Sequence, residues 1–282
     1  IAVKSRNPEI KSPIICLVGP PGVGKTTLSM GIAKALNKEF YKISVGGLND
    51  SGELIGHRRT YLGANPGKII QGIKKCNSAN PLILIDEVDK MVKDFKGDPA
   101  SCLLDILDPD QNKYFTDNYI EEPFDLSKVL FILTANNIYD IPSALYDRLE
   151  IITLSSYTQF EKLDIAKKYL LPNLYKEHIV NSKQIKFSDE ILLTIINKYT
   201  KESGVRELER QLDKIIRKVI IDSIYDKKEI KVTINKTNIK KYLGLAKYDE
   251  NNVVENQKVG LVNALAYTPL GGLVSPIEAV MY

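Results

Sequence analysis

The chain has 282 residues, of which 44% are hydrophobic and 26% are charged, and its formal net charge is +4 at pH 7. This composition is typical of a globular protein with one large or two moderate domains, and no apolar run is long enough to cross a membrane. The three cysteines show no Cys-x-x-Cys spacing, which argues against disulfides and zinc and favours a reducing compartment. The small positive charge permits an anionic partner but identifies none. Because the chain begins with Ile1 rather than Met, we expect it to be a piece of a longer protein whose targeting signal is missing.

Short apolar runs alternate with helical stretches over residues 1–154. The runs lie at 14–18, 40–45, 82–85, 129–133 and 151–154, and the helical stretches lie at 25–36, 67–78 and 100–107. Several runs are apolar throughout rather than alternating with polar residues, which is typical of strands buried on both faces of a parallel sheet. The sequence therefore predicts a three-layer α/β domain here.

Amphipathic helical spacing replaces this pattern from about residue 155. Three apolar faces recur at helical spacing, within 160–170, 191–199 and 205–219. Ser188 and Ser203 are candidate start caps, Gly244 is a candidate stop, and residues 230–234 alternate as in a small strand. We therefore expect a separate helical domain at 155–246. Residues 247–282 are expected to form a linker and the first strands of a further domain, because they are too few to bury a core alone.

A glycine-rich loop joins the first predicted strand to the first predicted helix. It fits the phosphate-binding pattern G-x-x-x-x-G-K-[ST] at every specified position, with the residues Gly19, Pro20, Pro21, Gly22, Val23, Gly24, Lys25 and Thr26. Curled backbone N–H groups and the positive end of the helix dipole favour an anionic phosphate in such a loop. Lys25 would reach the outer phosphates, and the Thr26 hydroxyl would hold Mg²⁺. The alternative is a Gly/Pro turn that happens to contain a lysine.

Two further strands end in polar residues that suit nucleotide hydrolysis. Asp86 and Glu87 follow the apolar run 82–85, and neighbouring side chains of a strand point to opposite sides. Asp86 would then face a metal ion while Glu87 faces an attacking water; the alternative is a plain strand-to-loop transition. Asn136 follows the next apolar run, where it would orient water or contact the γ-phosphate, although an asparagine there is more often a turn residue.

Two arginines and one loop each have a functional and an ordinary interpretation. Arg148 either forms a surface salt bridge or reaches the γ-phosphate of a neighbouring subunit. Arg206 opposes the dipole at the start of a predicted helix, which suits either a bound phosphate or pairing with a nearby glutamate. Tyr61 and Leu62 lie in a basic and aromatic loop flanked by glycines, where they either grip an unfolded chain or anchor the loop.

Taken together, these segments resemble the ATP-dependent Lon proteases of the AAA+ class. The resemblance rests on GPPGVGKT, GHRRTYLGANPGKIIQ, NPLILIDEVDKM, GDPASCLLDILDPDQN, DLSKVLFILTANN, DRLEII and ESGVRELERQL, which cover most of residues 1–245. It implies an AAA+ α/β ATPase domain with a helical lid, ATP or ADP and Mg²⁺ as cofactors, and a homohexameric ring that unfolds proteins and threads them into a peptidase chamber. The phrases NPLILIDEVDK and DLSKVLFI look more like the mitochondrial branch, so the mitochondrial matrix is expected, with a bacterial-type cytoplasm as the alternative.

The resemblance also implies a role for each site residue. Residues 19–26 would be the Walker A loop, followed by Thr27 as a further nucleotide contact, and Asp86 and Glu87 would be the Walker B pair. The remaining roles would fall to Asn136 as sensor 1, Arg148 as an arginine finger acting in trans, Arg206 as sensor 2, Tyr157 near the adenine, and Tyr61 and Leu62 as the pore loop that pulls substrate.

Residues 264–272, ALAYTPLGG, resemble the opening of the family's peptidase domain. The chain ends before the region of the family's Ser–Lys dyad, and Ser275 and Lys258 are not that pair. A second hypothesis is an AAA+ motor acting on nucleic acid, such as a helicase or clamp loader. The loop that carries Tyr61 and Leu62 argues against this hypothesis, because grooves that track a nucleic-acid strand are positively charged. A third hypothesis is a nucleotide-binding module with little turnover, since a trans role of Arg148 would leave a single chain with an incomplete site.

Overall fold

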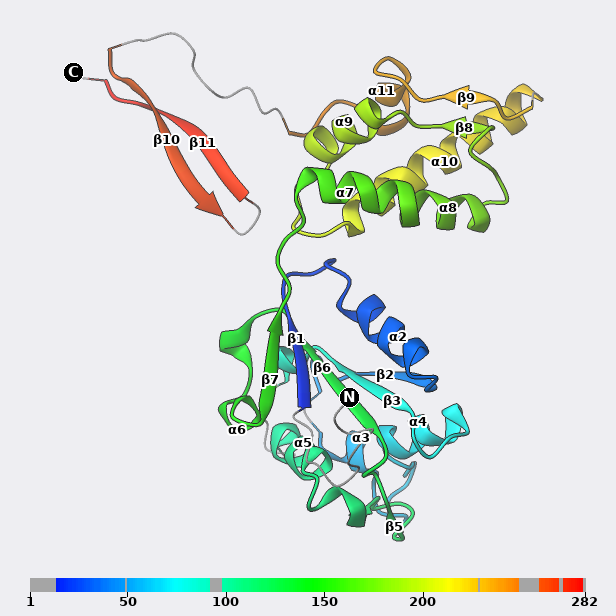
Figure 1. Cartoon of the computed structure of the whole chain (residues 1–282), viewed down its shortest axis with the longest axis vertical. Helices are drawn as coiled ribbons and strands as arrows, with labels where there is room; N and C mark the ends of the chain where they lie inside the picture. Colours follow the sequence, from blue (N-terminus) through cyan, green and yellow to red (C-terminus); the bar gives the residue numbers. More distant parts are fainter. Residues whose placement is uncertain are drawn as a thin grey trace. The chain divides into compact units, whose positions relative to one another are not determined.

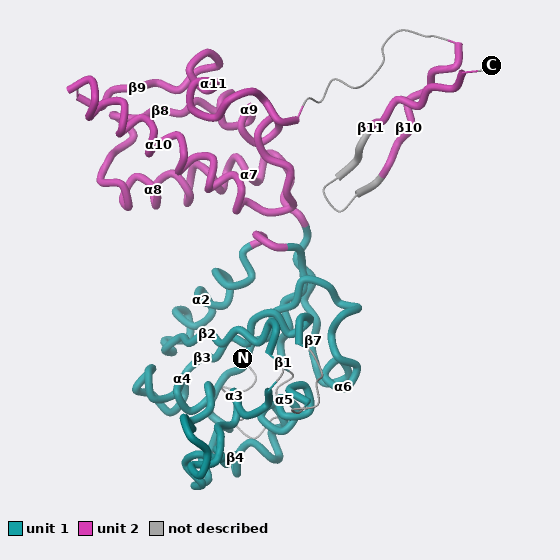
Figure 2. The backbone as a smooth tube through the Cα atoms, turned by 180° about the vertical axis from the view of Figure 1, so that it is seen from behind, with its two compact units in different colours: residues 1–20, 24–155 teal, residues 21–23, 156–282 magenta. Residues whose placement is uncertain are grey.

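The computed structural model describes residues 14–48, 50–91, 98–227, 229–248, 259–268 and 271–280. The chain divides into two compact units, which Figure 2 shows in different colours. Unit 1 comprises residues 1–20 and 24–155, and unit 2 comprises residues 21–23 and 156–282. None of the helices in these described segments is long and apolar enough to cross a lipid bilayer.

Unit 1 is built on a five-stranded sheet in which every neighbouring pair is parallel, in the order β2-β3-β6-β1-β7 (Figure 1). The strands are β1 (Ile14–Val18), β2 (Phe40–Ser44), β3 (Leu82–Asp86), β6 (Leu130–Ala135) and β7 (Leu149–Thr153). The predicted α/β class and parallel sheet are therefore confirmed. β7 starts earlier than the predicted run because Leu149 already pairs with Ile14. β6 runs further than predicted because Ala135 pairs with Val18.

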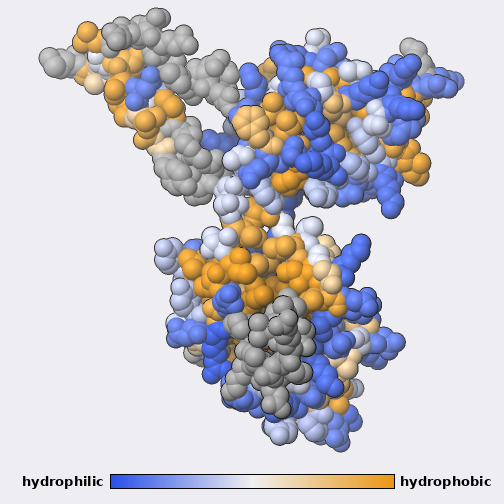
Figure 3. Space-filling view, viewed as in Figure 1, coloured by the Kyte–Doolittle hydropathy of each residue, from blue (hydrophilic) through white to orange (hydrophobic). Residues whose placement is uncertain are grey.

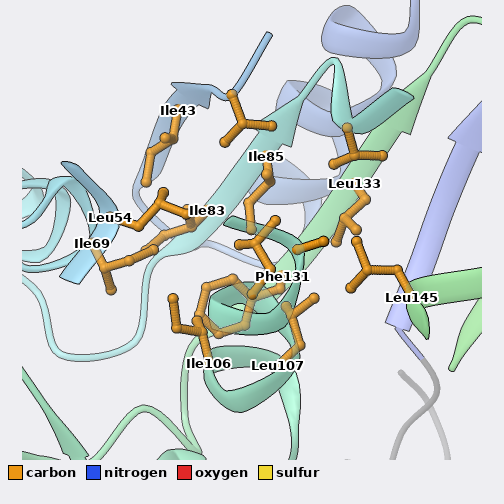
Figure 4. Close-up of a cluster of buried hydrophobic side chains, with 14 of the residues drawn as sticks. Ile43, Leu54, Ile69, Ile83, Ile85, Ile106, Leu107, Phe131, Leu133 and Leu145 are labelled. Atoms are coloured by element: carbon orange, nitrogen blue, oxygen red, sulfur yellow. The ribbon is translucent and has the colours of Figure 1, made fainter. Parts of the chain in front are cut away.

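Both faces of this sheet are buried. Leu82 and Leu84 of β3 belong to one apolar cluster with Leu17 and with Ala33 of a covering helix, whereas Ile83 and Ile85 belong to a larger cluster on the other face. Figure 4 shows the larger cluster, to which strands and helices both contribute. Residues of a strand alternate between faces, so burial on both sides makes the strands read as unbroken apolar runs.

The helices of unit 1 lie between the sheet strands in the order of the sequence. They are α2 (Lys25–Ala35), α3 (Gly52–Ile55), α4 (Lys68–Cys76), α5 (Pro99–Leu107) and α6 (Ser143–Tyr146). Short elements lie between them: the 3-10 turns η1 (Val88–Lys90), η2 (Asn112–Tyr114) and η3 (Ile138–Asp140), and the two-stranded antiparallel pair of β4 (Phe115–Thr116) and β5 (Pro123–Phe124). α5 begins where the Asp98 carboxylate accepts the backbone N–H groups of Ala100 and Ser101, with a proline in its first turn.

Unit 2 contains a helical core. Its helices are α7 (Gln159–Ile165), the π-helical segment η4 (Ala166–Leu170), α8 (Leu171–Glu177), α9 (Asp189–Tyr199), α10 (Arg206–Asp226) and α11 (Asn238–Leu243), and β8 (Ile185–Lys186) pairs in parallel with β9 (Val232–Thr233). The π-helical segment ends two residues before Pro172, which has no N–H to donate to the preceding turn. The predicted helical domain and the small strand within 230–234 are confirmed.

The expected caps in unit 2 have mixed outcomes. The Ser188 hydroxyl accepts the N–H of Ile191 and caps α9 as predicted, and Gly244 ends α11. Ser203 does not cap α10, since that helix begins at Arg206 and has Val205 before it. The Glu202 side chain instead accepts the N–H of Leu208 at 2.8 Å, so the cap comes from a longer side chain that reaches the first turn from farther back.

The last described element is an antiparallel hairpin of β10 (Leu261–Thr268) and β11 (Gly271–Glu278). Figure 3 shows apolar side chains on its surface, and Val262, Leu265 and Ile277 are all exposed. A two-stranded hairpin is marginally stable by itself in water. Its two strands match the expectation that a further domain begins in this region.

Candidate functional site

The phosphate loop has the strand–loop–helix geometry that its sequence predicts. β1 ends at Val18 and α2 begins at Lys25, with Gly24 as the residue before the helix. Gly22 and Gly24 have φ values of +86° and +85°, which side chains rarely tolerate and glycine adopts freely. The loop therefore turns sharply into the helix, and a helix N-terminus favours an anion.

Lys25 folds back over this loop. Its ammonium donates to the carbonyl of Gly19, to the carbonyl of Pro20 at 3.2 Å, and to Asn136 Oδ1 at 2.8 Å. Asn136 follows β6, which neighbours β1 in the sheet, and the N–H of Gly19 donates to Ala135 at 3.2 Å. Lys25 and Asn136, far apart in sequence, thus meet at the carboxyl ends of two adjacent strands, where ligands bind in open α/β sheets.

Asp86 and Glu87 lie at the end of β3, on the other side of β6. The Thr134 hydroxyl donates to Asp86 Oδ1 and accepts the Glu87 N–H at 3.2 Å, so one hydroxyl contacts both residues. Lys42 of β2 pairs with Asp86, and Lys90 pairs with Glu87 Oε1 at 2.6 Å. Each carboxylate therefore has its own lysine partner in the chain.

The local environment moves the pKa of Asp86. Burial pushes the pKa upward, but hydrogen bonds from Lys42 and Thr134 and the positive charges of Lys42 and Lys25 outweigh burial, so the pKa lies below its ordinary value. Asp86 is accordingly a carboxylate at neutral pH. An ionised carboxylate is a hard oxygen ligand of the kind that Mg²⁺ prefers.

Arg148 lies directly before β7, and its side chain is half-exposed. It donates to Asp108 Oδ2 at 2.9 Å, just beyond the end of α5. The structure of this single chain thus shows the salt bridge that was the ordinary interpretation. It does not test whether Arg148 reaches a neighbouring subunit.

The residues of unit 2 predicted to contact nucleotide gather around residues 21–23, the middle of the phosphate loop. The Tyr157 hydroxyl donates to the Val23 carbonyl at 2.8 Å, and the Val205 N–H donates to the Gly22 carbonyl at 3.3 Å. Arg206, the first residue of α10, is exposed. The side chain of the neighbouring Glu207 contacts Arg210 and Gln211.

Three family descriptions match consecutive parts of the chain. The AAA family, "ATPase family associated with various cellular activities", matches residues 15–157. The Lon protease AAA+ ATPase lid domain matches residues 176–232, and the Lon protease (S16) C-terminal proteolytic domain matches residues 233–282. The chain belongs to the Lon protease family.

Similar curated proteins agree with this assignment. A Lon protease of Ureaplasma parvum is 53% identical over 281 residues, which are 99% of this chain and 36% of that protein. A Lon protease of Clostridioides difficile is 51% identical over 99% of this chain and 35% of its own length. A Lon protease of Dictyoglomus thermophilum is 50% identical over the whole chain and 36% of its own length. The chain thus spans about a third of the length of the curated relatives that it matches.

These relatives correct one expectation from the sequence. Those described are bacterial, so the likeness to the mitochondrial branch finds no support. The phrases on which that expectation rested form β3 and the start of β6, which are buried on both faces. Buried strands tolerate volume-conserving exchanges between apolar residues, so the particular apolar residues in these strands are a poor marker of lineage.

Sequence reasoning missed four residues that contact the predicted site residues: Lys42, Asp89, Lys90 and Thr134. Asp89 Oδ2 accepts the N–H groups of Asn136 at 2.9 Å and Asn137 at 3.3 Å, which fixes the turn that carries Asn136. Its other oxygen, Oδ1, is buried and has no hydrogen-bond partner in the described structure. The one available signal was the cluster of charged residues that follows β3, which places Asp89 and Lys90 directly after Glu87.

Proposed function

We propose that this chain is the ATP-hydrolysing motor module of a Lon-type ATP-dependent protease, which couples hydrolysis to unfolding and translocation of protein substrates. The observation that carries the proposal is the convergence of Lys25, Asn136, Asp86 and Glu87 at the carboxyl ends of β1, β6 and β3 beside a phosphate loop. Membership of the AAA family implies use of a nucleotide.

The phosphate loop and two polar residues suit Mg²⁺ with ATP or ADP. The described residues contain no cluster of three or more His, Cys, Asp or Glu that would hold a metal alone. Mg²⁺ is usually bound by one or two protein oxygens together with substrate phosphates and water. Thr26 and Asp86 would supply those protein oxygens, while residues 19–27 hold the phosphates.

Three side chains of this chain would then carry out the hydrolysis. Glu87 takes a proton from the attacking water, Asn136 orients that water, and Lys25 neutralises charge on the outer phosphates. Lys25 must exchange its present carbonyl partners for phosphate oxygens. Bound Mg²⁺ would supply electrostatic stabilisation of the developing charge.

The remaining site residues keep the roles that the resemblance implies. Tyr157 would lie near the adenine and Arg206 would contact phosphate, with the chain organised as domains 1–154, 155–246 and 247–282. Arg148 would act in trans on a neighbouring subunit of a homohexameric ring, for which it must leave Asp108.

Unfolded or damaged protein is the proposed substrate, gripped by Tyr61 and Leu62. Tyr61 is 65% exposed and Leu62 is fully exposed, which supports a gripping role more than anchoring of the loop by burial. The relatives are named proteases, and the peptidase dyad would lie outside this chain. Because the relatives described are bacterial, we propose a bacterial-type cytoplasmic location.

Variants of the full-length protein test the hydrolysis site. Lys25→Ala should abolish nucleotide binding, since it removes the ammonium from the phosphate loop. Glu87→Gln should bind nucleotide and lose hydrolysis by about 100-fold or more, because the proton acceptor is gone. Nucleotide affinity and the steady-state ATPase rate check both, with Glu190→Gln on α9 as a matched control. Wild-type hydrolysis by Glu87→Gln would contradict the role of Glu87.

The nucleic-acid alternative has a separate readout. Stimulation of ATP hydrolysis by an unfolded protein, and none by single-stranded DNA, is the expected result. The reverse pattern would favour a nucleic-acid motor, which neither the exposed apolar tip nor the Lon family match supports.

A further inference from the structure

The loop that carries Tyr61 and Leu62 has an exposed tip and a closed neck. At the tip, the N–H of Tyr61 donates to Arg58 at 3.0 Å and the N–H of Ala64 donates to Tyr61 at 3.1 Å. At the neck, the chain enters at Gly56 and leaves at Gly67. The tip is therefore shaped by its own short turns, whereas the neck decides how firmly the loop is held.

The two arms of the neck touch through their backbones. A Cβ atom on Gly67 would overlap the Leu54 carbonyl and would lie 2.6 Å from the Gly56 nitrogen. Just above, the N–H of His57 donates to Asn65 at 3.3 Å. This close approach leaves no space for a side chain between the arms.

A carboxylate from a different segment closes the neck. Asp117 is 1% exposed, and its Oδ2 accepts the Gly67 N–H at 2.7 Å. Its Oδ1 accepts the N–H groups of Tyr119 at 2.9 Å and Ile120 at 3.1 Å. A buried carboxylate is costly unless several donors satisfy it, and charge-assisted bonds of this kind are about twice as strong as neutral ones.

The segment around Asp117 holds the loop at further points. The Asn118 N–H donates to Ile55 at 2.7 Å, and the Asn118 side chain donates to the Gly56 carbonyl at 3.1 Å. Arg59 donates to the Tyr119 carbonyl at 2.5 Å, and its guanidinium lies 5.2 Å from the centre of the Tyr119 ring. Residues 117–120 thus brace both the neck and the first arm of the loop.

We propose that Asp117 is a positioning residue that fixes the neck of the loop at residues 57–66, so that a pull on Tyr61 and Leu62 is transmitted to the sheet of unit 1. Without this carboxylate the loop would bend under load, and ATP would be consumed without moving the chain that the tip holds. The inference rests on the proposed function, in which the tip grips an extended polypeptide.

Asp117→Asn in the full-length protein is the sharpest test. It keeps the shape of the side chain but turns one acceptor into a donor, so the Gly67 N–H or the turn at 119–120 loses its partner. Hydrogen exchange of the amides at 56–67 should accelerate about 10- to 100-fold, the effect of losing one charge-assisted hydrogen bond. The number of ATP molecules consumed per unfolded protein processed should rise, while ATP hydrolysis without substrate stays close to wild type.

Asp125→Asn is the matched control. Asp125 accepts the Ser127 N–H at 2.8 Å within its own short turn and has the same side-chain chemistry, so its substitution should leave loop exchange and substrate processing unchanged. Arg59→Gln removes the second brace at an exposed position. It should give a smaller change in the same direction, and it provides the test if Asp117→Asn fails to fold.

The outcomes separate this proposal from the function on which it rests. Wild-type substrate processing by Tyr61→Ala would overturn the gripping role of the tip, and the positioning role with it. If Tyr61→Ala impairs processing while Asp117→Asn leaves loop exchange unchanged, Asp117 does not fix the neck. If exchange accelerates but the ATP consumed per substrate does not change, a fixed neck is not needed for pulling.

Discussion

The hydroxyl of Thr134 shows how much of the hydrolysis site depends on one buried group. Thr134 is fully buried in β6, yet it donates to Asp86 and accepts from the backbone of Glu87. A hydroxyl is the smallest side-chain group that donates and accepts at once. It therefore ties the Asp86 carboxylate to the backbone of Glu87, two residues to which we assign different tasks.

Replacing Thr134 with Val should preserve packing and remove both bonds. We expect a loss of about 1–3 kcal/mol of unfolding free energy, because buried polar partners are left unsatisfied, together with a lower ATPase rate in the full-length protein. Thr153→Val at the exposed end of β7 is the control. Denaturant unfolding and steady-state hydrolysis measure the two effects, and an unchanged ATPase rate would show that these two bonds are unimportant for hydrolysis.

The same substitution has a pH signature. The Thr134 bond helps to lower the pKa of Asp86 in the folded state, so its stabilising effect is present above the unfolded pKa of about 4 and is lost as the pH falls through the folded pKa. The part of the stability difference between Thr134→Val and wild type that comes from Asp86 should shrink below about pH 4. Unfolding free energies measured across that range check the sign.

At the residue scale, the sequence predicted groups with a local signature and missed groups defined by distant partners. Lys25 and the carboxylates after β3 stand in short patterns with a known chemical reason. Lys42 could not be assigned, because its partner Asp86 lies on another strand and only the register of β2 with β3 brings them together. Asp89 acts on the backbone of Asn136, which leaves no mark in the sequence.

At the scale of elements, the sequence predicted the buried strands more accurately than the caps of helices. The apolar runs gave the five sheet strands with boundaries within a few residues, since both faces of the sheet are buried. The cap of α10 was wrongly assigned to Ser203, because Glu202 reaches the Leu208 N–H from outside the usual cap position. The same stretch receives a second contact, in which the Lys162 ammonium donates to the Glu202 carbonyl.

Glu202→Ala should therefore destabilise unit 2. Loss of a capping hydrogen bond typically costs about 1 kcal/mol, and here it would loosen the first turn of α10, which carries Arg206. Thermal or denaturant unfolding provides the measurement, with the exposed Glu229→Ala as the control. Equal stability of the two variants would show that the cap is not needed.

At the scale of the whole molecule, the role of Arg148 depends on whether neighbouring copies share a site. In the single chain it is bound to Asp108. An arginine finger acting in trans predicts complementation: Arg148→Ala retains a phosphate loop but lacks the finger, and Lys25→Ala retains the finger but lacks the loop. Each full-length variant should be inactive alone.

A mixture of these two variants should recover ATP hydrolysis. About a quarter of the interfaces in a random assembly would pair an intact loop with an intact finger. Recovered activity, measured after mixing and re-assembly, supports the trans role. No recovery, in assemblies shown by sizing to contain both variants, would contradict the trans role of Arg148.

The division of the chain into units has a practical meaning for hybrid proteins. Residues 21–23 sit in the middle of the phosphate loop but make their contacts with Tyr157 and Val205, and so belong to unit 2. A graft that exchanges the ATPase domain of one Lon protease for that of another therefore has three junctions rather than one. Hybrids that take these three residues from the same protein as their helical domain should be more stable than hybrids cut once near residue 155.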